Sequence, residues 1–147
     1  MKFLNKNASF EHHIDEKVEA GINLLGSEVK SIRQGRVSLK GSFVRVGNSE
    51  AYLVNAQIEP YPYARPEGYD PRRTRKLLLH KKQILMFKQK LDQGNYTIVP
   101  VSLYFRHGLA KLEIGLARGR KQYEKKELIK KREQKRELAR AFSGKIH

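Results

Sequence analysis

The last 30 residues of the chain carry too much charge to join a hydrophobic core, and this confines the folded part to the residues before them. From Arg118 to the C-terminus, 12 Lys and Arg stand against 4 Asp and Glu, which is half of the net charge of +16. Like charges also recur at helical spacing, as at Lys126 and Lys130, and each such pair costs a helix roughly 0.2–0.5 kcal/mol. We therefore predict a folded body at residues 1–119 and a basic tail at residues 120–147 that is disordered when free.

Nothing else in the tail sequence prevents a helix. Between Glu124 and Phe142 there is no Pro or Gly, and most residues are good helix formers. Phosphate groups would remove the repulsion between the cations, so one hypothesis is a tail that folds on RNA. The alternative is a solvated charged helix with no partner.

The composition excludes several classes of protein. The chain of 147 residues contains no Cys, which rules out disulfides, thiolate metal sites and a Cys nucleophile. The five His residues show no metal-site spacing, and no phosphate-binding Gly-rich loop is present, so we expect neither a metal nor a cofactor. No apolar run is long enough to span a membrane, and the N-terminus lacks a secretory signal, so we expect a cytoplasmic protein. The isoelectric point near 10.2 indicates a polyanionic partner such as nucleic acid.

Short strands joined by tight turns dominate the expected body. Apolar residues fall on even positions from Ile14 to Ile22, the period of a half-buried strand, and Gly21 marks a bulge or a close approach. Two hairpins are expected, one joining residues 43–46 to 51–54 and the other joining residues 96–105 to 109–117. Residues 1–9 show no pattern and are expected to form a loose lead-in.

Two short helices complete the prediction. The first begins with Ser27 as N-cap and ends at Gly35. The second covers residues 81–93, with Ile84, Leu85, Phe87 and Leu91 on its apolar face. Because strands and helices do not alternate regularly, we predict a mainly β fold. It is a small antiparallel OB-like barrel of about six strands with two to three short helices.

A Pro-rich loop from about residue 59 to 74 precedes a second basic cluster, Arg72–Lys76. Arg side chains suit phosphate groups, although a plain solubilising loop is an equal alternative. Tyr61, Tyr63 and Tyr69 in this loop could stack on unpaired bases or simply cover the barrel.

Five segments, taken together and in register, resemble the family of small protein B, the bacterial SsrA-binding proteins that partner transfer-messenger RNA (tmRNA). The resemblance runs from about Asn5 to Arg140, and its segments are Glu19–Ile22, Gly26–Gly35, Asp70–His80, Tyr104–Phe105 and Gly115–Lys126. The family pattern has a His where this chain has Phe10, and it commonly has Asp-Lys-Arg at Glu124–Lys126.

The resemblance implies a body that holds the tRNA-like domain of tmRNA and a tail that becomes helical in the ribosome. There the tail would occupy the decoding site of 16S rRNA and the empty mRNA channel, and stalled ribosomes would be rescued by trans-translation. The protein would interact with elongation factor Tu and alanyl-tRNA synthetase only indirectly, through tmRNA. The same resemblance implies a monomer that is not an enzyme.

Site residues are carried over by matching position. In the body, the resemblance assigns RNA binding to Glu19 and Leu78, with these neighbours added by type and place: Asn5, Lys30, Arg33, Arg75, Lys76 and Lys111. In the tail, the expected ribosome contacts are Arg118, Gly119, Lys121, Tyr123, Glu124, Lys125, Lys126, Lys130, Lys131 and Arg132.

Two alternatives to this function remain open from the sequence. One is a general RNA-binding or ribosome-associated OB-type protein. The other is a small RNA nuclease that pairs a His with Glu19 or Glu28, for which the residues offer no positive evidence.

Overall fold

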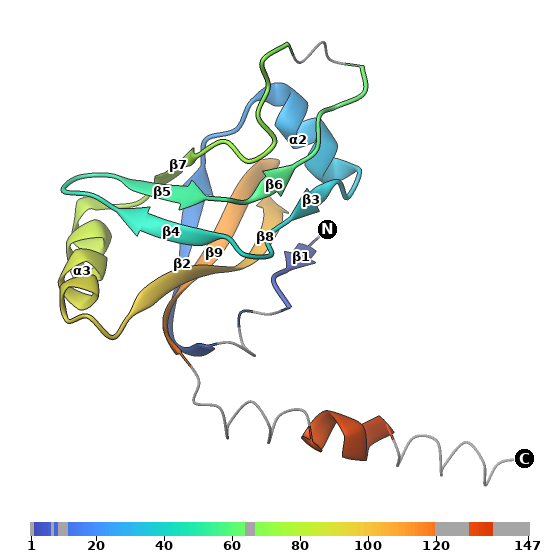
Figure 1. Ribbon diagram of the computed structural model, residues 1–147. Coiled ribbons are helices and arrows are strands. Elements are labelled where there is room, and N and C mark those ends of the chain that lie inside the picture. The colour runs from blue at the N-terminus through green and yellow to red at the C-terminus, as the bar shows by residue number, and fades with distance from the viewer. Residues whose placement is uncertain (1, 7, 9–11, 64–66, 120–129, 137–147) are drawn as a thin grey trace, which may run out of the picture.

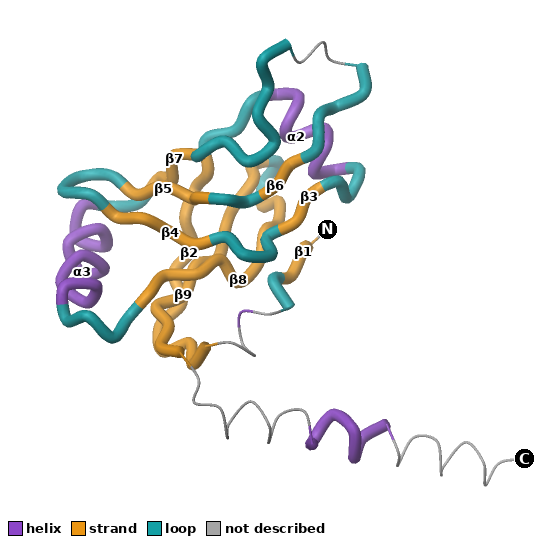
Figure 2. The backbone as a smooth tube through the Cα atoms, in the orientation of Figure 1, coloured by secondary structure: helices purple, strands orange, loops and turns teal. Residues whose placement is uncertain are grey.

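The computed structural model of the chain describes residues 2–6, 8, 12–63, 67–119 and 130–136. Two helices, α2 (Gly26–Arg33) and α3 (Lys81–Asp92), lie at opposite ends of a body built from strands (Figure 1). Residues 130–136 are also helical. The strands, orange in Figure 2, are β1 (Lys2–Leu4), β2 (His12–Ile22), β3 (Val37–Ser38), β4 (Phe43–Val46), β5 (Ala51–Val54), β6 (Gln57–Ile58), β7 (Arg75–Leu78), β8 (Thr97–Arg106) and β9 (Leu109–Gly119).

Six of these strands close into a barrel. The hydrogen-bonded order β8-β4-β5-β7-β2-β9 returns to β8, because β8 pairs with both β4 and β9. Strand β1 also pairs with β8, at a different point along that strand from β4. Strands β3 and β6 form a separate two-stranded sheet. All of these pairings are antiparallel, so the predicted mainly β barrel of about six strands is confirmed.

The barrel interior is filled by alternate residues of its strands. Leu112, Ile114 and Leu116 of β9 are at most 1% exposed, and Ala20 of β2 is fully buried beside them. Burial of one such aliphatic side chain stabilises the fold by roughly 1.5–3 kcal/mol. Ile32 of α2 joins the same core, which is why a helix of two turns persists there.

Helix α3 was predicted correctly in extent but not in every detail of its apolar face. Ile84 and Phe87 are buried and Leu91 is partly buried against the core. Leu85, however, is 56% exposed and lies off that face. Gly94 follows the helix with a φ of 84°, the left-handed conformation expected of its end. None of the described helices has the length and apolar character needed to cross a membrane.

The expectation of a loose lead-in at residues 1–9 is wrong for residues 2–4. These residues form β1, which pairs with β8 through Lys2↔Tyr104, Phe3↔Leu103 and Leu4↔Ser102. Phe3 packs against the core. Three residues are too few to show a period, and their partner strand lies about 100 residues away in the sequence.

Helix α2 begins earlier than predicted. Its N-cap is Leu25 and not Ser27, and Glu28 sits at the third helical position. There its carboxylate accepts a hydrogen bond of 2.9 Å from the main-chain N–H of Leu25, which otherwise has no helical partner. The end of the helix agrees with the prediction, since Gly35 adopts a φ of 76°.

Candidate nucleic-acid interface

Five strands place a single row of residues across the outer side of the sheet. Cross-strand pairing joins Lys2 to Tyr104, Tyr104 to Lys111, Lys111 to Gly21, and Gly21 to Leu78. Directly opposed residues of antiparallel strands have Cβ atoms about 5 Å apart, so the row is continuous. We call this row and its neighbours the sheet face, and define it as Lys2, Glu19, Gly21, Lys76, Leu78, Tyr104, Arg106 and Lys111.

Leu78 stands out on the sheet face because it is an aliphatic side chain that is 58% exposed. It lies over Gly21, where an added Cβ would come within 3.1 Å of the Leu78 Cβ. Because Gly21 has no side chain, β2 and β7 can pair closely while the Leu78 side chain lies over the Gly21 position. This confirms the predicted close approach. The fold holds an apolar side chain in place at the surface and leaves it open to a partner.

Glu19 is fixed in orientation by two neighbours on β8. Its carboxylate accepts hydrogen bonds from the Tyr104 hydroxyl at 2.5 Å and from the Arg106 guanidinium at 3.2 Å. The Tyr104 bond is the main reason that the pKa of Glu19 is lowered. Burial and the Glu19 carboxylate together raise the pKa of Tyr104 to about 12. Glu19 thus presents an ionised, oriented acceptor that suits base amino groups and ribose hydroxyls.

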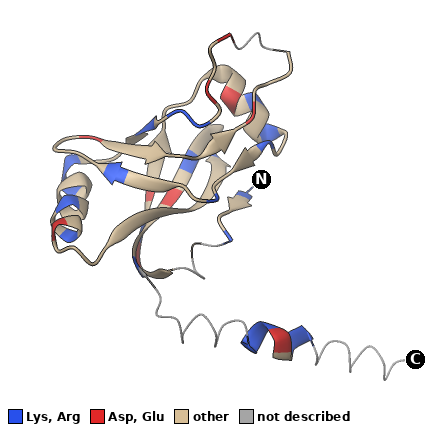
Figure 3. Cartoon of the chain, viewed as in Figure 1, with Lys and Arg blue, Asp and Glu red and all other residues tan. Residues whose placement is uncertain are grey.

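Charges of both signs border this acceptor, because Glu113 is its direct partner on β9 and the cations Arg106 and Lys111 lie close enough to lower its pKa. Lys2 lies over the Tyr104 ring at 5.9 Å, and exposed Lys76 reaches Glu50 at 3.3 Å. Lys111 is half-buried in the same row. Lys and Arg residues are spread over several elements of the body and are not confined to its C-terminal end (Figure 3). Such a distribution suits phosphate groups at more than one point.

The other predicted body residues lie outside the row. Asn5 follows β1, where its side-chain amide donates to the Pro100 carbonyl at 2.9 Å. Lys30 and Arg33 belong to α2, where Lys30 lies 5.4 Å from the Tyr61 ring and Arg33 lies 4.4 Å from the Phe105 ring. The structure therefore gathers Glu19, Lys76, Leu78 and Lys111 on one face and places Lys30 and Arg33 on a helix.

The prediction that Arg75 binds RNA is wrong. Its side chain is fully buried, and its guanidinium contacts the Glu28 carboxylate at 2.6 Å. It also donates to the main-chain carbonyls of Ala56 at 2.8 Å and Pro71 at 3.0 Å. With its donors occupied inside the protein, Arg75 cannot reach a phosphate without leaving the core.

Glu28 is the centre of this buried cluster. Besides Arg75, its carboxylate accepts hydrogen bonds from the Arg73 guanidinium and from the Tyr69 hydroxyl at 2.9 Å. Burial alone would raise the pKa of Glu28, but hydrogen bonds from Arg73, the Leu25 N–H and Arg75 outweigh burial and lower it. Tyr69, a predicted stacking residue, is thus engaged within the protein.

Contacts within the protein occupy most of the cations of the second basic segment, Arg72–Lys76. Arg72 donates to Asn55 at 3.0 Å and to Gln57 at 3.1 Å, while Arg73 and Arg75 bind Glu28. Three of its four cations thus attach the loop before β7 to the body. Tyr63 differs from Tyr69, since it is 84% exposed and meets Tyr61 edge to face.

The start of the tail is described only in part. Arg118 is exposed at the end of β9 and pairs with Asp15 at 3.1 Å, and Gly119 pairs with His12 in the sheet. The predicted contacts Lys121, Tyr123, Glu124, Lys125 and Lys126, like Phe10 near the N-terminus, lie outside the described residues. Lys130, Lys131 and Arg132 are exposed on the helical residues 130–136.

Sequence reasoning missed three side chains of the sheet face, Lys2, Tyr104 and Arg106. Arg106 carries a usable signal, because it follows Tyr104 by two residues and must share its side of the strand. Lys2 carries none, because its strand has no sequence pattern. Within the described ranges, no group of three His, Cys, Asp or Glu could hold a metal ion.

Comparison with known proteins agrees with the resemblance in the sequence. Residues 2–144 match the SmpB protein family. An SsrA-binding protein of Sulfurihydrogenibium sp. is 51% identical over 97% of this chain and 93% of its own, and one of Aquifex aeolicus is 49% identical over 97% and 92%. A solved chain described as "tmRNA-SmpB: a journey to the center of the bacterial ribosome" is 42% identical, with a TM-score of 0.70 over 87% of this chain and 94% of that one. The chain therefore belongs to the SmpB protein family.

Proposed function

We propose that this chain binds the tRNA-like domain of tmRNA through its sheet face and delivers it to stalled ribosomes for trans-translation. The observation that carries the proposal is the sheet face, where the row from Lys2 to Leu78 supplies cations and an exposed leucine and the neighbouring Glu19 supplies an oriented carboxylate. The names of the relatives support the choice of RNA, since they are called SsrA-binding proteins.

The tail has a separate role in this proposal. It contacts the decoding site and the empty mRNA channel, where phosphates offset the repulsion between its cations. The exposed cations at 130–136 support this assignment. Elongation factor Tu and alanyl-tRNA synthetase act on the tmRNA and need no surface of this chain. Because the chain acts on the ribosome, its place is the cytoplasm.

The chain acts here as an adaptor and not as an enzyme. Glu28, one of the two carboxylates proposed for a nuclease, is enclosed by two guanidinium groups and 1% exposed, which supports this assignment. RNA incubated with the pure protein, with and without magnesium, should remain intact. Cleavage would revive the nuclease alternative.

The sheet face is tested by reversing the charge of Glu19. Glu19→Arg should weaken binding to the tRNA-like domain at least about tenfold, the loss of one good polar contact. Glu67→Arg in the exposed loop is the matched control, because both changes add two positive charges and so favour RNA binding in general. A loss confined to position 19, with native circular dichroism, reports a specific contact.

Equal affinities of the two variants would remove Glu19 from the site. Competition with bulk tRNA tests the choice of RNA in the same assay. The tRNA-like domain should displace bulk tRNA at much lower concentration, whereas equal competition would favour the general RNA-binding protein.

A further inference from the structure

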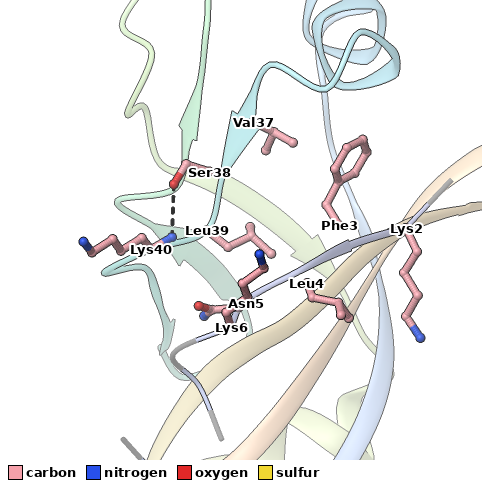
Figure 4. Close-up of a pocket in the computed structure, with 9 residues that line it drawn as sticks. All are labelled: Lys2, Phe3, Leu4, Asn5, Lys6, Val37, Ser38, Leu39 and Lys40. Atoms are coloured by element: carbon pink, nitrogen blue, oxygen red, sulfur yellow. Dashed lines mark hydrogen bonds between the residues drawn. The ribbon is translucent and has the colours of Figure 1, made fainter. Parts of the chain in front are cut away.

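A groove of about 510 Å³ runs beside β1 and shares only Lys2 with the sheet face. Residues 2–6 form one wall and residues 37–40 form the other (Figure 4). Its apolar lining includes Phe3, Val37 and Leu39, of which Leu39 is 5% exposed and the other two are half-buried. The groove thus offers an apolar surface between two polar walls.

The charge of the groove is entirely positive. Exposed Lys6 comes from one wall and exposed Lys40 from the other, while Lys2 stands at the end of β1. No Asp or Glu is among the residues that line it. An apolar lining with a cation on each wall suits a ligand that is anionic along its length and flat and apolar in its middle.

One wall also presents main-chain groups. In the strand order, β1 is an edge, with β8 on one side only among the described residues. The Asn5 N–H donates to the Val101 carbonyl at 2.9 Å, so by the alternation of an antiparallel ladder the main-chain groups of Lys2 and Leu4 point away from β8. These donors and acceptors face the side on which the groove lies.

We propose that the groove holds an unpaired nucleotide of the RNA whose tRNA-like domain lies on the sheet face. The phosphates of the strand contact Lys6 and Lys40, and the base rests on the apolar lining between them. The two surfaces are continuous, because Lys2 belongs to both. The inference rests on the proposed function and adds to it a second contact of a different kind.

The size of the groove decides between paired and unpaired RNA. Sites that hold one small molecule measure roughly 300–1,000 Å³, and a volume of about 510 Å³ falls in that range. A duplex shields its bases and cannot enter such a space, whereas a looped-out nucleotide can place its base there. An acidic peptide added to the edge of β1 is the competing occupant, and the experiment distinguishes the two.

Photocrosslinking of the full chain to full-length tmRNA tests the proposal. The photoreactive residue p-benzoylphenylalanine replaces Ser38 on the far wall of the groove, Leu78 on the sheet face, or Leu85 on α3. All three positions are exposed, which equalises their access to solvent. The crosslinked nucleotides are mapped by primer extension.

We expect position 38 to crosslink to an unpaired nucleotide, position 78 to crosslink to the tRNA-like domain, and position 85 to remain unreactive. A crosslink at 78 without one at 38 overturns the groove and leaves the proposed function intact. Crosslinking at 38 to a paired nucleotide also overturns it, as does crosslinking at 38 only to a ribosomal protein when ribosomes are added. Crosslinking at neither position 38 nor position 78 contradicts both proposals.

The lysines provide a second, quantitative arm. The double variant Lys6→Ala, Lys40→Ala should bind full-length tmRNA about tenfold more weakly. The slope of its log affinity against log salt concentration should fall in magnitude by about 1.4 to 1.8, because two phosphate contacts are lost. The control Lys81→Ala, Lys82→Ala removes the same charge from exposed positions on α3. Equal effects of the two double variants would show that the groove lysines act only through net charge.

Discussion

Glu28 shows how one residue can decide whether a basic segment serves folding or binding. Arg73 and Arg75 look from the sequence like phosphate ligands, yet both point inward to this carboxylate. The pairs are separated by 45 and 47 residues, so no local pattern announces them. The buried cluster attaches the loop before β7 to α2, and it leaves Lys76 as the outward cation of its strand.

Removal of the Glu28 charge should therefore destabilise the fold. Glu28→Gln leaves the buried Arg75 guanidinium without a counter-charge, which costs about 3 kcal/mol or more. Urea denaturation measures the free energy of unfolding. The control Glu50→Gln disrupts the exposed pair with Lys76 and should change it by less than about 1 kcal/mol. A small effect at both positions would show that the cluster contributes little to stability.

The same carboxylate predicts a pH dependence of stability. The folded chain lowers the pKa of Glu28, whereas the unfolded chain returns it to its ordinary value of 4.5. The stabilisation is therefore complete above that value and is lost as the pH falls through the lowered pKa. Chemical denaturation at about pH 7 and at about pH 3 should show a smaller gap between the native chain and Glu28→Gln at the lower pH. A gap that does not change would contradict this role.

At the scale of elements, the parts predicted well are those with local signals. Helix α3 and the β8–β9 hairpin follow from hydrophobic period and turn residues, and the left-handed φ values of His107 and Gly108 form that turn. The parts missed depend on distant contacts. Strand β1 forms because β8 has a free edge with which it can pair. The N-cap of α2 is Leu25 because the Glu28 carboxylate accepts a hydrogen bond from the Leu25 main-chain N–H.

The same division applies to the candidate site. The family resemblance points to Glu19 and Leu78, and the structure shows how they come to share one face: Gly21 pairs with Leu78, and Glu19 reaches Tyr104 and Arg106 across the sheet. Arg75 was misassigned because the sequence shows its charge and not its burial.

Close packing between β9 and β2 yields a prediction for an element. An added Cβ at Gly115 would meet the Ile14 Cγ2 at 2.6 Å and the Val101 Cγ2 at 3.2 Å. Gly115→Ala should therefore destabilise the barrel by about 1–3 kcal/mol through overpacking. At Gly47 the nearest atom lies 3.7 Å from an added Cβ, so Gly47→Ala serves as the control. Equal thermal midpoints for the two variants would mean that the strands adjust to a Cβ at Gly115 without loss of stability.

At the scale of the whole molecule, the charge divides between two parts with different physical character. The body fixes its polar groups in a hydrogen-bonded surface, with Glu19 held by two partners. The described tail residues 130–136 expose every side chain. A surface with fixed geometry can select one RNA, whereas exposed cations bind phosphate without selection. We therefore propose that the body selects the RNA and that the tail engages the ribosome.

Truncation after Gln122 tests this division most directly. Affinity for the tRNA-like domain is measured at about 0.15 M salt, where charges more than about 8 Å apart are screened, and rescue of stalled ribosomes is measured in the same preparation. We expect the affinity of the truncated chain to stay within about threefold of that of the full chain, a difference under about 1 kcal/mol, while rescue is abolished. Loss of most of the affinity together with rescue, or rescue that survives truncation, would contradict this division.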